Sequence, residues 1–225
     1  MLYSERTVRD NLRNRDGKRV FYLGKGDQLT SDARDFLRRE RIEILPGETA
    51  RPQRYRLLSG GYLEEKPEEM THLCGDILVS KTHPRIAFRG ALDTLEGEFL
   101  LTALALPEQR KDLEALLTFT RQILRCEVME EPLPRTDLCG LTPEQLRSHS
   151  HRPQDYYGVA HFMPEVADGE PVLRLNRLRA MTRQAELAAV RAFTDETGKA
   201  TRPDLLQGLN RLSSMLYILM IRAKQ

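Results

Sequence analysis

The segment PDLLQGLNRLSSMLYILMIRA, residues Pro203–Ala223, decides the fold of this chain. Its leucines recur at alternating spacings of four and three residues, at Leu205, Leu209, Leu212, Leu216 and Leu219. This spacing places them on one face of an α-helix and predicts a packing seam. The second half of the segment is apolar nearly all round. We therefore expect the helix to be buried inside a bundle or between subunits.

A polar stripe follows the same helical spacing along this segment. Its members are Asn210, Ser213, Ser214 and Tyr217. It is either a solvated face or the wall of a ligand site or subunit interface. Because the helix that carries it is otherwise apolar, we expect the stripe to face something polar.

Helical patterns appear in four further segments: from Pro84 to Pro107, in a second helix that ends at Glu131–Pro134, in a short helix opened by the capping box Thr142–Gln145, and in Val172–Phe193. Helices of about 20 residues are about 30 Å long, a length that suits bundle packing. The intervening segment His149–Gly169 is rich in His, Tyr and Phe and is expected to be an ordered loop. The sequence thus predicts a mainly α protein with a five-helix-type bundle.

The first 45 residues have a different pattern and predict a small α+β unit. A polar helix over Ser4–Arg15 and a strand at Val20–Leu23 come first. A helix capped by Thr30 or Ser31 then runs through Arg41, and a second strand covers Ile42–Leu45. Residues 46–69 are rich in Gly, Pro and Arg and are expected to be a linker. The bundle domain is expected to span residues 70–225.

The composition excludes several classes of protein. The formal net charge is +2, so the chain lacks the strong positive charge typical of nucleic-acid binding. No apolar run approaches the roughly 20 residues of a membrane span, and the first residues are too charged for a secretory signal. Three scattered cysteines do not form a disulfide framework. We expect a cytoplasmic protein with a small anionic ligand.

Charged residues stack on two of the expected helices. Arg179, Arg183 and Glu186 are spaced i, i+4 and i+7 and therefore share a face. Arginine presents a planar fork suited to phosphate oxygens. On the first bundle helix, Asp93 lies beside core leucines, stacked with Arg89 and Glu96. We expect it to be half-buried and to need an arginine partner. The alternative is a ladder of surface salt bridges.

Other motifs are less specific. Gly24–Asp27 resembles part of a phosphate-binding turn but lacks the spacing of a P-loop, so a plain turn is expected. His72 and Cys74 have no second pair at zinc spacing. The histidines between His149 and His161 are more typical of loop residues than of metal ligands. No nucleophile, histidine and carboxylate follow one another in a hydrolase pattern.

Several segments together resemble the ethanolamine-utilisation corrinoid adenosyltransferases, which are related to the PduO-type enzymes. These segments are Leu29–Ile44, Met70–Leu73, Val79–Arg85, Phe88–Asp93, Leu175–Arg179 with Arg183 and Glu186, Thr201–Asp204 and Leu209–Ser214. The resemblance implies a helical bundle that forms homo-oligomers, with active sites between subunits. It also implies transfer of the 5′-deoxyadenosyl group of ATP, with Mg²⁺, to cob(I)alamin, which yields adenosylcobalamin and triphosphate. A reductase and a bacterial microcompartment are further partners that it suggests.

The resemblance also implies roles for single residues. Lys81 would bind phosphates, and Arg183, Glu186 and Asn210 would bind ATP. The catalytic residues would be Arg183 and the pair that Asp93 forms with Arg179 across the site. Phe162 would remove the lower axial ligand of the corrinoid. Some members of the family bind a transition metal through a histidine and a cysteine cluster. Residues 50–70 contain neither residue type, so we expect no such metal site. Two other classes remain open: a non-catalytic corrinoid-binding or microcompartment protein, and a helical interaction module.

Overall fold

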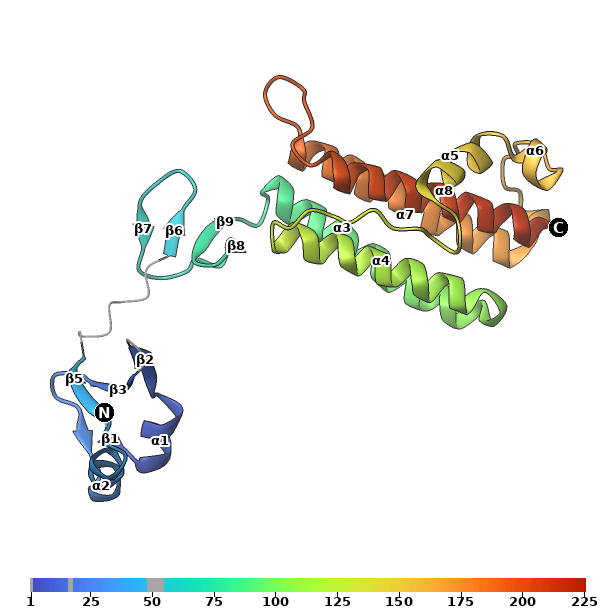
Figure 1. The fold of residues 1–225 in the computed structure, drawn as a ribbon. Coiled ribbons are helices and arrows are strands. Elements are labelled where there is room, and N and C mark those ends of the chain that lie inside the picture. Colours follow the sequence, from blue (N-terminus) through green and yellow to red (C-terminus); the bar gives the residue numbers. More distant parts are fainter. Residues whose placement is uncertain (1, 16–17, 48–54) are drawn as a thin grey trace. The chain divides into compact units, whose positions relative to one another are not determined.

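A computed structural model describes residues 2–15, 18–47 and 55–225 of the chain. It divides into two units, Met1–Lys66 and Pro67–Gln225. Figure 1 colours the chain from its N-terminus in blue to its C-terminus in red. No helix in these described ranges is both long and apolar enough to cross a membrane.

The first unit is built on short strands and two helices. Its elements are β1 (Leu2–Tyr3), α1 (Glu5–Asp10), β2 (Arg13–Arg15), β3 (Lys18–Leu23), β4 (Gln28–Leu29), α2 (Ser31–Arg39) and β5 (Glu43–Pro46). Strand β3 pairs with β2 antiparallel and with β5 parallel. The Thr30 hydroxyl accepts a hydrogen bond from the amide of Ala33 and caps α2, as predicted. Phe21 and Phe36 are buried at the centre of a small separate core.

Two predictions for this part of the chain need correction. The helix predicted over Ser4–Arg15 ends at Asp10, because the backbone of β2 pairs with β3 instead of continuing the helix. The expected linker contains an antiparallel hairpin, β6 (Tyr55–Leu57) and β7 (Tyr62–Leu63), while residues 48–54 of it lie outside the described residues. Gly60 and Gly61 both have positive φ, at 88° and 89°, which allows the tight turn of this hairpin. The Gly24–Asp27 segment forms a plain turn, as expected.

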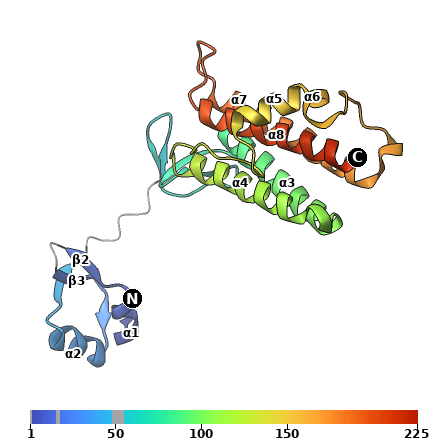
Figure 2. The same cartoon turned by 45° about the vertical axis from the view of Figure 1, so that its right-hand side comes forward.

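The second unit is the helical bundle. It begins with a hairpin that the sequence did not predict, β8 (Met70–Cys74) and β9 (Ile77–Ser80). The helices that follow are α3 (Pro84–Ala105), α4 (Arg110–Val128), α5 (Pro143–His151), α6 (Pro153–Tyr157), α7 (Gly169–Phe193) and α8 (Pro203–Lys224), with 3₁₀ turns η1 (Pro107–Gln109) and η2 (Val166–Asp168). Helix α7 packs against α8 and α3, α3 against α4, and α5 against α8 (Figures 1 and 2). The mainly α bundle with a small α+β unit before it is therefore confirmed.

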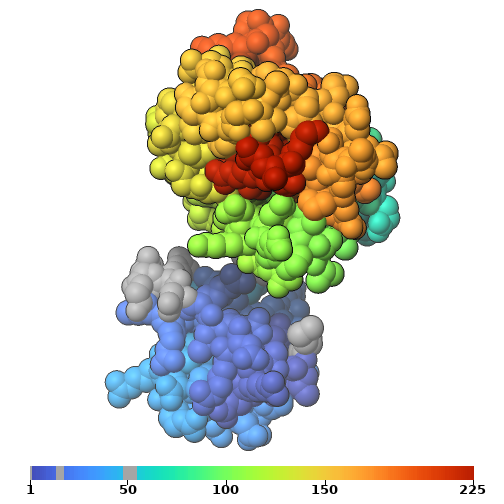
Figure 3. Space-filling view, turned by 90° about the vertical axis from the view of Figure 1, so that its right-hand side faces the viewer, coloured from blue at the N-terminus to red at the C-terminus, as the bar shows by residue number. Residues whose placement is uncertain are grey.

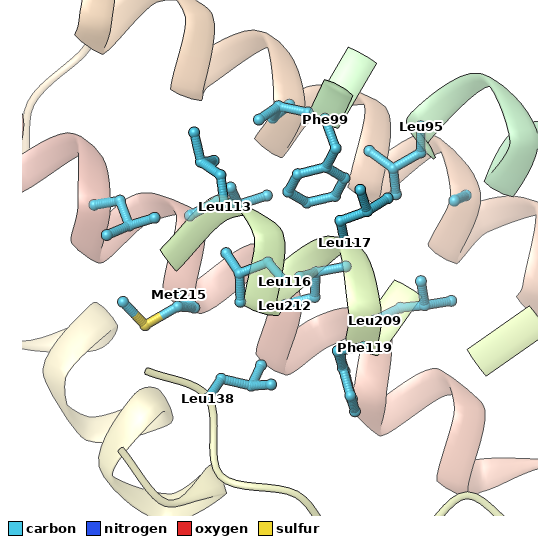
Figure 4. Close-up of a cluster of buried hydrophobic side chains, with 14 of the residues drawn as sticks. Leu95, Phe99, Leu113, Leu116, Leu117, Phe119, Leu138, Leu209, Leu212 and Met215 are labelled. Carbon is cyan, nitrogen blue, oxygen red and sulfur yellow. The ribbon is translucent and has the colours of Figure 1, made fainter. Parts of the chain in front are cut away.

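The core of the bundle lies along the predicted leucine seam of α8. All five leucines of that seam are buried. Figure 4 shows Leu209 and Leu212 among side chains of the other helices, including Phe99 of α3 and Leu116 of α4. The helix is also buried around its second half, where Tyr217 is 7% exposed. Interior packing thus sets the orientation of α8, and with it the side that its polar stripe faces.

The predicted loop His149–Gly169 is partly helical. Helix α5 continues to His151, and Pro153 opens the short helix α6, which ends at Gly158 with a positive φ of 67°. Proline at the first helical position and glycine at the C-cap are the usual ends of a helix. The capping box at Thr142 is present as predicted, with both of its hydrogen bonds. The prediction of a loop was wrong for α6. A helix of 5 residues is too short to show a helical repeat of apolar residues in the sequence.

A buried carboxylate joins α3, α4 and β8. Glu127 is completely buried, and its two oxygens accept hydrogen bonds from Arg85 Nε and Arg89 Nε, each at 2.5 Å. Arg89 also donates to the carbonyl of Leu73 on β8, at 2.9 Å. Burial alone would lower the pKa of Arg85, but its hydrogen bonds to Glu127 and Glu130 raise the pKa above its ordinary value. This cluster fixes the hairpin to the start of the bundle.

A second charged pair fixes the start of α8. Arg202 binds Asp204 and donates to the carbonyl of Glu131 at 2.8 Å. Asp204 in turn accepts from the amide of Leu133, also at 2.8 Å. The Thr201–Asp204 motif therefore serves to hold the segment after α4 against α8.

Candidate functional site

A cavity of about 930 Å³ lies beside α7 and α8. Helix α7 contributes Arg179, Arg183 and Glu186, and α8 contributes the whole of the predicted polar stripe. The remaining walls come from the end of α5 and from residues 161–164, which precede η2. Because residues at i, i+4 and i+7 share a helix face, one orientation of each helix turns all of these side chains toward the cavity.

One part of the cavity is a connected set of polar groups. The Asn210 amide nitrogen donates to Glu186 Oε1 at 3.1 Å, and thereby links α8 to α7. Arg211 Nη2 donates to the Asn210 side-chain oxygen at 2.8 Å. Ser214 donates to the Asn210 backbone carbonyl at 3.1 Å. The Asn210 side chain is therefore held from two sides before any ligand arrives.

The basic part of the cavity consists of Arg179 and Arg183. Neither Arg179 nor Arg183 forms an ion pair with a carboxylate among the described residues of the chain. Arg179 instead lies over the ring of Tyr217, with its guanidinium carbon 5.2 Å from the ring centroid. Burial, and then the neighbouring charge of Arg183, lower the pKa of Arg179. Both observations indicate a place where an anion would be stabilised.

The remaining wall is aromatic and apolar. Phe162 is half-buried and stacks on Tyr217, with ring centroids 5.9 Å apart. Met163 projects into solvent with 85% of its surface exposed, and Leu187 and Val190 of α7 are exposed at the rim. An anionic group and a large apolar group can thus both be accommodated, on different walls.

Five of the predicted site residues line this one cavity. They are Phe162, Arg179, Arg183, Glu186 and Asn210. Lys81 and Asp93 do not line it. Lys81 is an exposed residue after β9, and Asp93 is exposed on α3. The expectation that Asp93 would be half-buried was wrong, because one residue after buried Leu92 the helix has turned by about 100° toward solvent.

The charged residues predicted to stack with Asp93 have other partners. Arg89 belongs to the Glu127 cluster, and Glu96 pairs with Arg121 of α4 at 2.9 Å. No ion pair joins Asp93 to Arg179 within the described residues of a single chain. The polar stripe of α3 is therefore structural in part and solvated in part.

Two residues near the site have contacts that the sequence analysis did not predict: His161, which was considered only as a loop residue or a metal ligand, and Arg211, which was not considered. His161 Nδ1 lies 3.1 Å from the Tyr217 hydroxyl. Arg211 holds Asn210, while its Nε and Nη1 atoms are buried without a hydrogen-bond partner. The adjacent ring residues His161 and Phe162 were a usable signal for the first. No local signal separates Arg211 from an ordinary surface arginine.

The described residues contain no group of three or more His, Cys, Asp and Glu side chains arranged to hold a metal ion. His72 and Cys74 both lie on β8. The expectation that the chain has no transition-metal site stays a prediction. Among the lining residues, Glu186 supplies the acidic side chain. Since Mg²⁺ in nucleotide sites is held by one or two carboxylates together with phosphate oxygens, this donor set fits a Mg²⁺ ion that arrives with a nucleotide.

Comparisons with known proteins identify the family of the chain. The family model described as cobalamin adenosyltransferase matches residues 61–223. Proteins named corrinoid adenosyltransferase EutT from Salmonella typhimurium and from Escherichia coli K12 are each 35% identical to the chain over 158 residues. These alignments cover 70% of this chain and 59% of each relative, so the chain spans less than two thirds of their length. No solved structure is detectably similar to it. The chain belongs to the cobalamin adenosyltransferase family.

Proposed function

We propose that the chain transfers the 5′-deoxyadenosyl group of ATP to cob(I)alamin, and so forms adenosylcobalamin and releases triphosphate. The observation that carries the proposal is the pair of arginines, Arg179 and Arg183, which face the cavity and form no ion pair with a carboxylate in the part of the chain that the structure describes. An arginine pair of this kind is suited to a polyphosphate, because each guanidinium presents two parallel donors to phosphate oxygens.

The ATP side of the reaction needs charge stabilisation. When the carbon–oxygen bond to the ribose breaks, negative charge grows on the leaving triphosphate. Arg179 and Arg183 would stabilise that charge, and preorganised donors of this kind have large effects in sites that exclude water. Glu186 and Asn210 would hold the rest of the nucleotide. A hydrogen bond between them already fixes the positions of both side chains. A Mg²⁺ ion bound to the phosphates near Glu186 would neutralise further charge.

The corrinoid side needs no protein nucleophile, because Co(I) itself attacks the ribose carbon. The chain must position the two substrates and keep the cobalt free of its lower axial ligand. Phe162 and Tyr217 form an apolar wall that would exclude this ligand and water. With this division, phosphate binding and corrinoid binding would use different residues of one cavity.

A second copy of the chain would complete the site. The exposed face of α3 contains Gly90, Gly97, Leu101 and Leu104, with the leucines 60% and 73% exposed. Nothing lies within 4 Å of a Cβ built on either glycine. Glycine inside a helix lowers the stability of the fold by about 1 kcal/mol relative to alanine. Two glycines beside exposed leucines make a flat apolar face, and such a face supports close packing of a second chain. Asp93, which is exposed in the single chain, would then pair with the Arg179 of a neighbour, and Lys81, which is also exposed, would reach the phosphates.

Chain mixing tests this arrangement. Asp93→Ala and Arg179→Ala chains, each inactive alone, should recover part of the turnover when they are mixed, because some sites in a mixed oligomer carry neither substitution. Leu101→Glu with Leu104→Glu should give a monomer in sedimentation velocity. Leu58→Glu, at an exposed leucine of the first unit, is the control. No recovery on mixing, with monomeric active wild-type protein, would exclude a shared site.

The cellular setting is also part of the proposal. Transfer in ethanolamine utilisation, in the cytoplasm and at a bacterial microcompartment, with a reductase that supplies Co(I), is supported by the resemblance of the sequence segments. The names of the EutT relatives support the corrinoid adenosyl transfer itself.

The central test is anaerobic incubation of the chain with ATP and chemically reduced cobalamin, followed by the loss of the cob(I)alamin absorption. Arg179→Ala should keep the helical circular dichroism and lose about 100-fold or more in rate. Arg174→Ala is the matched control, because Arg174 lies on the same helix and pairs with Glu170 at the surface. No ATP-dependent conversion by wild-type protein that still binds corrinoid would favour the non-catalytic alternative.

A further inference from the structure

The segment Val159–Asp168 links α6 to α7 and supplies one wall of the cavity. We propose that Tyr217 is a positioning residue with two separable tasks. Its hydroxyl fixes the 159–168 segment, and with it Phe162, while its ring supports Arg179. The kinetic part of this inference rests on the proposed function, whereas the structural part does not.

The hydroxyl acts through His161. Nδ1 of His161 lies 3.1 Å from the Tyr217 hydroxyl, and Nε2 lies 3.1 Å from the backbone carbonyl of His151. A carbonyl oxygen can only accept, so Nε2 carries a hydrogen and donates. In the neutral ring Nδ1 is then the acceptor, and the Tyr217 hydroxyl donates to it. The imidazole thus bridges the buried part of α8 and the end of α5.

Packing and charge hold the rest of the segment on α8. The rings of His161 and Phe162 both stack on Tyr217, with centroids 5.8 and 5.9 Å away. Lys224 Nζ lies 4.5 Å from the Phe162 centroid and also pairs with Asp168. Figure 3 shows the C-terminal end of α8, in red, with gold and orange parts of the chain above and beside it and green parts below it. Tyr217 is the buried member of this group, so it defines where the exposed His161 lies.

The same ring also positions the phosphate-binding side. The Arg179 guanidinium carbon is 5.2 Å from the Tyr217 centroid, within the range of a cation–π contact. Since Arg179 has no carboxylate partner, this ring is its main fixed contact in the described chain. A phenylalanine at position 217 would keep the ring and lose the hydroxyl, so the two tasks can be tested separately.

Limited proteolysis tests the hydroxyl without any substrate. Chymotrypsin should cleave after Phe162 about fivefold faster in Tyr217→Phe and in His161→Ala, because one lost hydrogen bond raises the population of the detached segment by about that factor. Mass spectrometry identifies the cut. Tyr157→Phe is the matched control, since it removes a tyrosine–histidine hydrogen bond to His149 outside the cavity. Unchanged cleavage in both variants, or an equal rise in the control, overturns the proposal.

Steady-state kinetics tests the separation of the two tasks. Tyr217→Phe should raise the KM for reduced cobalamin about fivefold and leave the KM for ATP within about twofold, because the ring under Arg179 remains. A rise confined to the KM for ATP, or equal rises in both constants, contradicts the assignment. If wild-type protein shows no turnover, the proposed function fails, and the cleavage rates alone decide the role of the hydroxyl.

Discussion

Replacement of Glu127 by glutamine should destabilise the bundle strongly. The wild-type carboxylate is fully buried and bonded to two guanidinium groups, each at 2.5 Å. An amide keeps one acceptor oxygen but turns an NH₂ group toward donors, so two arginines lose their shared counter-charge. Breaking a buried ion pair on one side costs about 3–5 kcal/mol. The side chains of Arg85 and Arg89 are each 16% exposed and can recruit some water, and Arg85 keeps Glu130. We therefore expect Glu127→Gln to lower the free energy of unfolding by about 3 kcal/mol.

Urea unfolding followed by circular dichroism at 222 nm measures this loss, because most of the helical signal comes from the bundle. Protein concentration is held constant, since any self-association adds to the apparent stability. The loss corresponds to a fall in Tm of about 6–12 °C. Glu170→Gln is the control, because Glu170 pairs with Arg174 at the surface. This substitution should lower the free energy of unfolding by less than about 0.5 kcal/mol. A loss below about 1 kcal/mol for Glu127→Gln would refute the view that this cluster holds α3 and α4 together.

Three further predictions concern caps and charges. His83 caps α3 through Nδ1, which accepts from the amide of Arg85, and burial together with the charge of that arginine lowers the His83 pKa. Its neutral form is thus favoured on folding, so its contribution is complete above the ordinary pKa of 6.5 and declines as the pH falls. His83→Asn, which keeps a capping side chain, should lose less stability than wild type between pH 7 and pH 5 in urea titrations; equal losses would exclude the role. Arg183→Met should stabilise the free protein by about 0.2–0.5 kcal/mol, because it removes a like-charge neighbour of Arg179 one turn away. It should also reduce the rise in Tm caused by inorganic triphosphate, and an undiminished rise would place the anion elsewhere. Thr142→Ala should cost about 1 kcal/mol in urea unfolding through loss of the α5 cap, and a neutral effect would show that this cap is dispensable.

The sequence by itself determined the long helices of the bundle and the faces that α7 and α8 present. Leucine spacing in Pro203–Ala223 identified the buried seam of α8 and the polar stripe beside it. The i, i+4 and i+7 spacing placed Arg179, Arg183 and Glu186 together, and the structure has them on the wall of one cavity. These features depend on neighbours within a few residues, so local periodicity is enough to predict them.

Only the tertiary structure decided which charges are structural and which are left for a ligand. Arg89 and Arg179 look alike in the sequence, but Arg89 meets Glu127, 38 residues away, while Arg179 meets the ring of Tyr217. A charge is neutralised or left unpaired according to what the packing of distant helices brings within about 4 Å, and residue spacing along one helix carries no information about that distance.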